Sequence, residues 1–182
     1  MLYIKSKVGN IDIIVPNLGN GKSSTSNYLE KDEWIKFLNI NLLSVVNLID
    51  TLFPIIKKNE SSSIVFISSI VAVERIDAPY GYSSSKISLI PLMKHLSYQY
   101  AEHKIRVNCV LPGNVYFEGG RWEELLSDNI NIYKEYILTQ VPLKRLATPE
   151  EIANSIVFLS SPKSSFTTGS TLVIDGGQTR SW

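Results

Sequence analysis

Short apolar runs rich in β-branched residues alternate along this chain with longer segments of helical periodicity. Runs of this kind are typical of strands that lie in a parallel sheet and are covered on both faces. Four such runs occur, at 11–15, 63–69, 105–113 and 170–177. Because neighbouring parallel strands need long crossover connections, usually helices, the alternation predicts a single α/β domain over residues 1–182.

The segments between the runs have the pattern of the required helices. Residues 32–58 are apolar on most faces of a helix, and Pro54 kinks or ends it. Residues 83–104 form a second long helix. Residues 148–161 form a third, which opens with Thr-Pro-Glu-Glu, the pattern of a capping box. We therefore expect a parallel sheet that lies between helices.

The segment 114–147 has no such periodicity and is irregular. It is rich in aromatic residues, namely Tyr116, Phe117, Trp122, Tyr133 and Tyr136. Irregular aromatic segments beside a strand-end crevice are suited to covering a ligand. We interpret 114–147 as a substrate lid within the domain, and ordinary loop packing is the alternative interpretation.

Composition and charge exclude several classes of function. The chain has 18 basic and 17 acidic residues, and its net charge of +1 provides no field for nucleic acid or an anionic membrane. A single cysteine, Cys109, excludes an internal disulfide and a thiolate cluster, and two histidines are too few for a histidine-based metal site. Residues 1–10 do not resemble a secretory signal, and no apolar run approaches the roughly 18 residues that span a bilayer. These observations indicate a soluble, cytoplasmic protein without a metal.

Polar and small residues gather where the predicted strands end. Asn17 and Gly19 follow the first strand, Ser69 ends the second, and Pro112 and Gly113 end the third. In open α/β sheets the ligand crevice lies outside the carboxyl ends of the strands. Ordinary strand and turn endings explain each residue alone, but their shared placement favours one common site.

Tyr82 and Lys86 are expected beside these residues, and they are four positions apart. On a helix this spacing places both side chains on one face, one turn apart. A phenol has a pKa of about 10, and a nearby ammonium lowers it. Such a phenol can exchange a proton with an alcohol or a developing alkoxide, and Ser69 can hydrogen-bond the same oxygen. Interconversion of a carbonyl and an alcohol also needs a hydride carrier, which implies a nicotinamide. The alternative is a solvated helix start with a chance pairing.

These motifs, in this order, resemble those of the short-chain dehydrogenase/reductase family over the whole chain, including its 3-oxoacyl-acyl carrier protein reductase-like oxidoreductases. YSSSK at 82–86 fits the family's Tyr-x-x-x-Lys motif, and Ser69 stands 13 residues before Tyr82, as the family's catalytic serine does. LNINLLSVVN at 38–47 resembles the segment that holds the family's fourth catalytic residue, which falls on Asn41. IDIIVPNLG, RVNCVLPG and TGSTLVIDGG resemble three strand ends of the family.

The resemblance implies a Rossmann-type three-layer α/β/α fold that interconverts a carbonyl and a secondary alcohol with NAD or NADP. It implies Tyr82 as the acid/base and Lys86 as the group that tunes the tyrosine and contacts the ribose. It implies Ser69 as the residue that orients the substrate, and Asn41 as the support of a water that links the lysine to solvent. The cofactor-binding residues that it implies are Asn17, Gly19, Tyr82, Lys86, Pro112, Gly113 and Val115. The partner is then a small-molecule substrate, with no nucleic acid or membrane, and the assembly is a homodimer or homotetramer.

Three departures from the family pattern stand out. Pro16 replaces the first asparagine of the strand-end motif, and Phe117 stands where many members have a threonine. Full-length members also begin with a strand, a glycine-rich turn and a helix that bind the dinucleotide phosphates. Alignment of the motifs puts this part, roughly 70 residues, before Met1, so the expected fold lacks the first strands of the full fold.

Two other interpretations compete with the enzyme. The loop GNGKSS at 19–24 is similar to a phosphate-binding P-loop, but Pro16 occupies the position of that motif's first glycine. The second is a truncated, catalytically impaired remnant of the family that acts as an interaction subunit, a role to which the two long apolar helices are suited.

Overall fold

The computed structural model describes residues 10–22, 29–57 and 59–180, and the strands in these ranges form one parallel sheet. The strands lie in the order β1-β2-β3-β4. They are β1 (Ile13–Ile14), β2 (Ser62–Ile67), β3 (Ile105–Pro112) and β4 (Thr171–Ile174). The predicted parallel sheet is therefore confirmed. The strand predicted at 11–15 is shorter than expected, because only Ile13 and Ile14 pair with β2.

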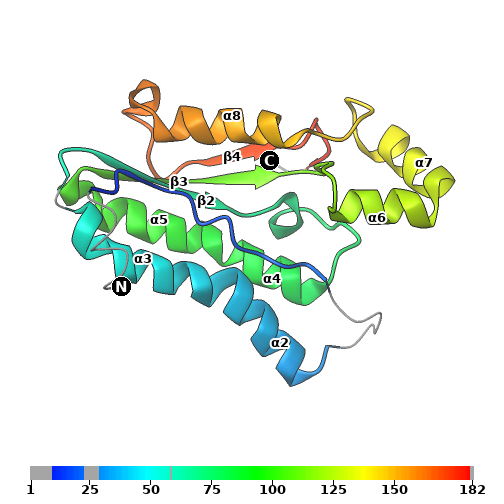
Figure 1. The fold of residues 1–182 in the computed structure, drawn as a ribbon, viewed down its shortest axis with the longest axis horizontal. Coiled ribbons are helices and arrows are strands. Elements are labelled where there is room, and N and C mark those ends of the chain that lie inside the picture. The colour runs from blue at the N-terminus through cyan, green and yellow to red at the C-terminus, as the bar shows by residue number, and fades with distance from the viewer. Residues whose placement is uncertain (1–9, 23–28, 58, 181–182) are drawn as a thin grey trace.

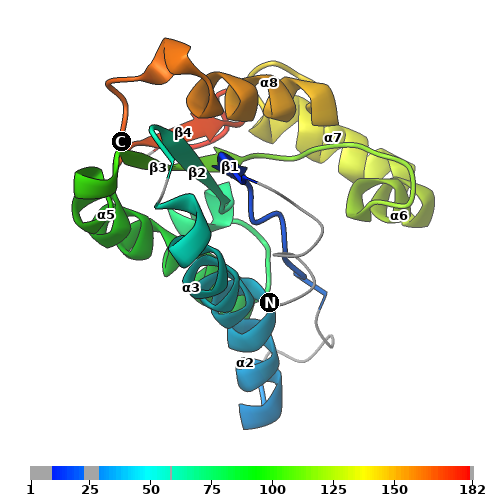
Figure 2. The same ribbon diagram turned by 60° about the vertical axis from the view of Figure 1, so that its left-hand side comes forward.

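Helices cover both faces of this sheet, which gives three layers (Figure 1, Figure 2). One face is covered by α3 and α5, and the other by α8, while α6 and α7 lie beyond the tip of β3 (Figure 1). The helices are α2 (Lys31–Leu38), α3 (Ser44–Ile56), α4 (Tyr80–Ile87), α5 (Leu89–Gln99), α6 (Arg121–Asp128), α7 (Ile130–Gln140) and α8 (Pro149–Ser160). Shorter turns are the π turn η1 (Asn39–Leu43) and the 3₁₀ turns η2 (Ile70–Ala72), η3 (Ala101–His103) and η4 (Pro162–Ser164).

The core consists of one apolar cluster on each face of the sheet, and β2 shows why. Successive side chains of a strand point to opposite faces. Ile64 and Phe66 therefore lie in the cluster that includes α3 and α5, whereas Val65 packs with Leu159 of α8. Because the strand is covered on both faces, consecutive residues at 64–67 are all apolar, as the sequence of this run predicted.

The segments α2, η1 and α3 form one continuous helical run, Lys31–Ile56, of 26 residues. By length and composition alone this run is apolar enough to cross a membrane, which corrects the expectation that the chain has no such segment. That expectation counted only uninterrupted apolar residues, whereas here polar residues are interspersed. In the structure, Val45 and Ile49 of the run pack into the core, as in the core helix of a globular domain. Pro54 lies in the last turn of α3, and residue 58, the predicted helix end, is outside the described residues.

The helix predicted at 83–104 begins earlier, at Tyr80, and divides at Ser88 into α4 and α5. The earlier start places both Tyr82 and Lys86 inside α4. The geometry that their spacing predicted, two side chains one turn apart on a helix, is thus present.

The sequence analysis expected the segment 114–147 to be irregular, but the structure shows that it contains the helices α6 and α7. The ring of Trp122 on α6 lies 6.0 Å from that of Tyr133 and 5.5 Å from that of Tyr136, measured between centroids. Helices this short are marginal alone and depend on packing against each other. Their short length therefore makes them difficult to recognise from the sequence alone. The interpretation of this segment as a substrate lid stays a prediction.

Candidate active site

The loop after β1 packs directly on α4 and η1. A Cβ atom at Gly19 would lie 2.9 Å from Lys86 Nζ and 3.1 Å from Asn41 Oδ1, so only glycine fits there without displacing these groups. A Cβ atom at Gly21 would lie 3.4 Å from the ring of Tyr82, at ordinary contact distance. The structure thus brings together four residues that the sequence placed in one site, Gly19, Asn41, Tyr82 and Lys86.

Lys86 is a buried cation at the end of β2, with an exposed fraction of 3 %. Its Nζ donates to the carbonyl oxygen of Ile67 at 2.9 Å and to that of Leu18 at 3.4 Å. The hydroxyl of Ser68 donates to the Lys86 carbonyl at 2.9 Å, which joins α4 to the end of β2. Burial lowers the pKa of Lys86 to about 8, because the charged form loses its hydration. The ammonium therefore remains mostly charged at neutral pH and is held by neutral carbonyls.

Tyr82 lies beside this cation and beside Ser69. Burial raises the pKa of Tyr82 above its ordinary value of 10.0, and a hydrogen bond with the Ser69 side chain lowers it by a smaller amount. The Lys86 Nζ lies 5.9 Å from the centroid of the Tyr82 ring. The lowered pKa expected from the neighbouring ammonium is therefore wrong for this structure, because the cost of burying a phenolate outweighs the other effects. Ser69 also caps η2, and its hydroxyl oxygen accepts from the Val71 N–H at 3.4 Å.

Asn41 is fully buried in the π turn η1 and clamps the loop after β1. Its Nδ2 donates to the carbonyl oxygen of Phe37 at 3.0 Å and to that of Asn20 at 3.2 Å, and its Oδ1 accepts from the Asn20 N–H at 2.9 Å. Single π turns inside α-helices are frequent at functional sites. The observed role of Asn41 is to fix the loop that lies on Lys86, and its support of a water relay stays a prediction.

The turn at 112–113 holds the end of β3 against the segment that follows β4. A Cβ atom at Gly113 would lie 2.7 Å from the Cα of Asp175, so the close approach of the two backbones requires glycine. The Gly113 N–H donates to the Ile174 carbonyl at 2.8 Å. Val115 then forms an isolated parallel bridge with Ala147, which brings together the two ends of the segment 114–147.

Sequence reasoning missed a polar cluster next to this turn. The Nδ2 of Asn114 donates to Gln178 Oε1 at 2.8 Å, and the Nε2 of Gln178 donates to the Tyr136 hydroxyl at 2.6 Å. The cluster connects the end of β3, the C-terminal segment and α7. In the sequence this cluster is marked only by an amide side chain directly after each of two glycine turns. The two amides are 64 residues apart, so the local sequence does not indicate that they are in contact.

Neither metal binding nor thiol chemistry is indicated. Within the described residues, no group of three or more His, Cys, Asp and Glu side chains is placed to hold a metal ion. Cys109 is buried in β3, and burial raises its pKa to about 12. Such a thiol is not a nucleophile at neutral pH.

The residues at this edge of the sheet fit the nicotinamide–ribose half of NAD or NADP. Gly19 and Gly113 keep the strand ends free of side chains, and Asn17 is exposed on the first loop. Lys86 and Tyr82 supply an ammonium and a hydroxyl, the groups that a ribose and a substrate oxygen need. In residues 10–22, 29–57 and 59–180 no strand is followed by the Gly-x-Gly-x-x-Gly turn that usually binds the pyrophosphate.

Two expectations concern residues outside the described ranges. Residues 1–9, which were considered for a secretory signal, are not described. The P-loop interpretation at 19–24 extends to residues 23 and 24, which are also outside the described residues. A P-loop needs a helix that begins at its Lys-Ser pair, whereas the nearest described helix, α2, begins only at Lys31.

A parallel sheet with a buried lysine, a tyrosine, a serine and an asparagine at the carboxyl ends of its strands has the arrangement of a Rossmann-type oxidoreductase. Residues 1–179 match a family model described as enoyl-(acyl carrier protein) reductase. The chain is 37 % identical over 172 residues to the 3-oxoacyl-[acyl-carrier-protein] reductase FabG of Chlamydia muridarum. The aligned region covers 94 % of this chain and 67 % of the relative.

Solved structures agree with the sequence relatives. L-sorbose reductase from Gluconobacter frateurii, complexed with NADPH and L-sorbose, superposes with a TM-score of 0.90 at 29 % identity, over 98 % of this chain and 70 % of that chain. A 7α-hydroxysteroid dehydrogenase complexed with NADH and 7-oxo glycochenodeoxycholic acid has a TM-score of 0.85 at 28 % identity, over 97 % and 67 %. The chain therefore belongs to the short-chain dehydrogenase/reductase family. It is an oxidoreductase of the class that acts on CH–OH groups with NAD or NADP, as the sequence predicted.

Proposed function

We propose that this chain interconverts a small-molecule carbonyl and a secondary alcohol, with Tyr82 as the acid/base. The observation that carries the proposal is the position of Tyr82 on α4, one turn from the buried ammonium of Lys86 and next to Ser69 after the end of β2. A substrate oxygen within reach of both hydroxyls receives two hydrogen bonds as negative charge develops on it. Preorganised donors of this kind supply a large part of the rate enhancement in many enzymes.

The nicotinamide, when bound, supplies or accepts the hydride. In the reduction, the Ser69 hydroxyl donates to the carbonyl oxygen and orients it, and the Tyr82 hydroxyl transfers its proton to the same oxygen. The raised pKa of Tyr82 keeps this hydroxyl protonated at neutral pH, which is the form that reduction needs. The ammonium of Lys86 then stabilises the phenolate, and Asn41 holds the loop that covers both groups.

The substrate is proposed only as a class. The relatives and structural neighbours are named for an acyl carrier protein thioester, a ketose and a steroid, which share a ketone or a secondary alcohol. We propose that Ser69 and Tyr82 bond only this group. The class is therefore a small-molecule ketone or secondary alcohol, and the remaining parts of the substrate are bound elsewhere.

Titration of the chain with NADPH and with NADH tests the proposal. Its three tryptophans report binding by fluorescence, and we expect saturable quenching followed by nucleotide consumption when a ketone is added. Lys86→Met should weaken nucleotide binding about tenfold, because a charge-assisted hydrogen bond is lost. If neither nucleotide binds to the wild-type chain, the proposal fails and the alternative of an interaction subunit is favoured.

We also propose a homodimer or homotetramer in which a second copy covers the outer face of α5. This face has a shallow hollow lined by Ile90, Pro91, Lys94, His95 and Tyr98. Tyr98 is 87 % exposed. A twofold axis would place each tyrosine against the hollow of the other copy, since such interfaces are self-complementary.

Light scattering after size-exclusion chromatography measures this assembly. Tyr98→Glu should shift the mass to that of the monomer, because a carboxylate in an apolar contact cannot be solvated. Phe166→Glu is the matched control, because Phe166 is fully exposed beside η4, outside this face. A wild-type monomer, or an unchanged mass for Tyr98→Glu, contradicts the proposed interface.

A further inference from the structure

The loop after β1 is joined to the catalytic residues by consecutive hydrogen bonds. Asn41 bonds both the N–H and the carbonyl of Asn20, at 2.9 and 3.2 Å. The Oδ1 of Asn20 in turn accepts from the Lys22 N–H at 2.8 Å. Gly21, between them, lies against the ring of Tyr82. The backbone of Lys22 is therefore fixed relative to the proposed acid/base.

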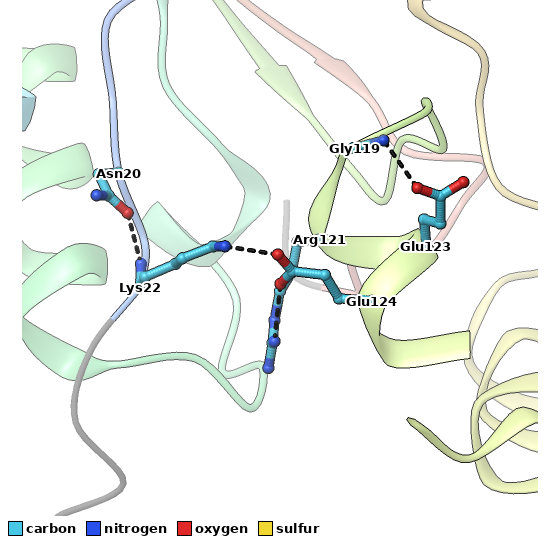
Figure 3. A network of polar contacts seen from close by, with 6 residues as sticks. All are labelled: Asn20, Lys22, Gly119, Arg121, Glu123 and Glu124. Atoms are coloured by element: carbon cyan, nitrogen blue, oxygen red, sulfur yellow. Dashed lines mark hydrogen bonds and ion pairs between the residues drawn. The ribbon is translucent and has the colours of Figure 1, made fainter. Parts of the chain in front are cut away.

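The side chain of Lys22 crosses from this loop to α6. Its Nζ donates to Glu124 Oε1 at 2.5 Å, between residues 102 positions apart in the sequence (Figure 3). Arg121 on the same helix donates to Glu124 Oε2 at 3.3 Å. The bonds from Lys22 and then Arg121 lower the pKa of Glu124, which keeps the carboxylate charged. A charged pair thus joins the loop on Tyr82 to the segment 114–147.

The beginning of α6 is hydrogen-bonded to the residues before it. Glu123 accepts from the Gly119 N–H at 2.8 Å and from the Tyr116 hydroxyl at 3.3 Å, so the helix start and its preceding turn are bonded together (Figure 3). The bridge between Val115 and Ala147 fixes the base of the segment to the sheet end. The contact of Lys22 with Glu124 is a further attachment, which joins α6 to the loop after β1.

We propose that Lys22 and Glu124 are positioning residues that form a latch, which holds α6 across the mouth of the site that contains Tyr82. Both side chains are partly exposed, at 66 % and 39 %. Exposed ion pairs are weak, so this latch opens readily and lets small molecules pass. Its consequence for substrate capture rests on the proposed function, whereas its effect on the position of α6 does not.

A double-mutant cycle measured by hydrogen–deuterium exchange tests the latch without any need for activity. Lys22→Met and Glu124→Gln should each raise the exchange rate of residues 121–140 about threefold, a size typical of an exposed pair. The double variant should also show about threefold rather than ninefold, because each single change already breaks the same contact. Lys163→Met removes an equivalent exposed charge beside α8 and should leave this exchange unchanged.

The latch is refuted if the single variants leave the exchange of 121–140 unchanged, or if their effects multiply in the double variant. Kinetics then add the functional consequence: a broken latch should raise KM about threefold and leave kcat within twofold. An unchanged exchange with a normal nucleotide-dependent reaction refutes the latch and leaves the proposed function intact. Altered exchange in a chain that binds no nucleotide supports the latch and refutes the proposed function.

Discussion

Replacing Tyr82 by phenylalanine should lower kcat for ketone reduction by two to four orders of magnitude, the range typical of a lost general acid. The change removes one oxygen from a half-buried ring and leaves its packing against Gly21 in place. The Ser69 hydroxyl can still bond the substrate oxygen, so KM should change little. Steady-state kinetics with saturating nucleotide and a reactive ketone measure both constants.

Tyr80→Phe is the matched control for this change. Tyr80 is two residues earlier on α4, and its hydroxyl accepts from the Leu29 N–H rather than bonding Ser69. Its loss should cost about 1 kcal/mol of stability and leave kcat within twofold. Turnover of Tyr82→Phe within tenfold of the wild type would show that another group moves the proton.

In the oxidation direction, the rate should still rise with pH at the ordinary phenol pKa of 10.0, since burial raises the pKa of Tyr82.

Replacing Lys86 by methionine should stabilise the folded chain at neutral pH while it abolishes most activity. The fall in the pKa of Lys86 from 10.5 to about 8 corresponds to a destabilisation of about 3 kcal/mol by the buried charge. Methionine has similar length and no charge, but it leaves the carbonyls of Ile67 and Leu18 without this donor. Each lost bond costs about 1 kcal/mol, so the net gain should be about 1–2 kcal/mol.

The pH dependence of the stability difference separates an effect of the buried charge from an effect of packing. Above the unfolded pKa of 10.5 the lysine is neutral in both states and the penalty is absent. The penalty grows as the pH falls from 10.5 to about 8, because over this range the lysine is protonated in the unfolded chain and neutral in the folded one, and it is constant below about 8. Urea unfolding from pH 7 to 10.5 should therefore show the wild type approaching the variant as the pH rises. A variant less stable than the wild type at pH 7, or a difference independent of pH, would contradict the buried-charge account.

The sequence predicted where the candidate site residues lie, because its signals are local or depend only on strand ends. The spacing of Tyr82 and Lys86 determines their geometry on any helix, and α4 has that geometry. The position of Ser69 follows from the end of β2 alone. The helices α6 and α7 were not found, because they are short, with 8 and 11 residues, and helices of this length are marginal without tertiary contacts such as those of the Trp122 ring.

By itself the sequence determined that this chain forms a parallel α/β sheet and that its polar residues meet at the carboxyl ends of the strands. Those features follow from side-chain periodicity and from the requirement of parallel strands for long connections. Only the tertiary structure decided the protonation of the site. The loop that Asn41 holds over Lys86 and Tyr82 helps to bury both groups, Lys86 almost completely and Tyr82 in part, and burial then raises the pKa of Tyr82 and lowers that of Lys86. Burial depends on segments that are distant in the chain, so no local pattern can encode it.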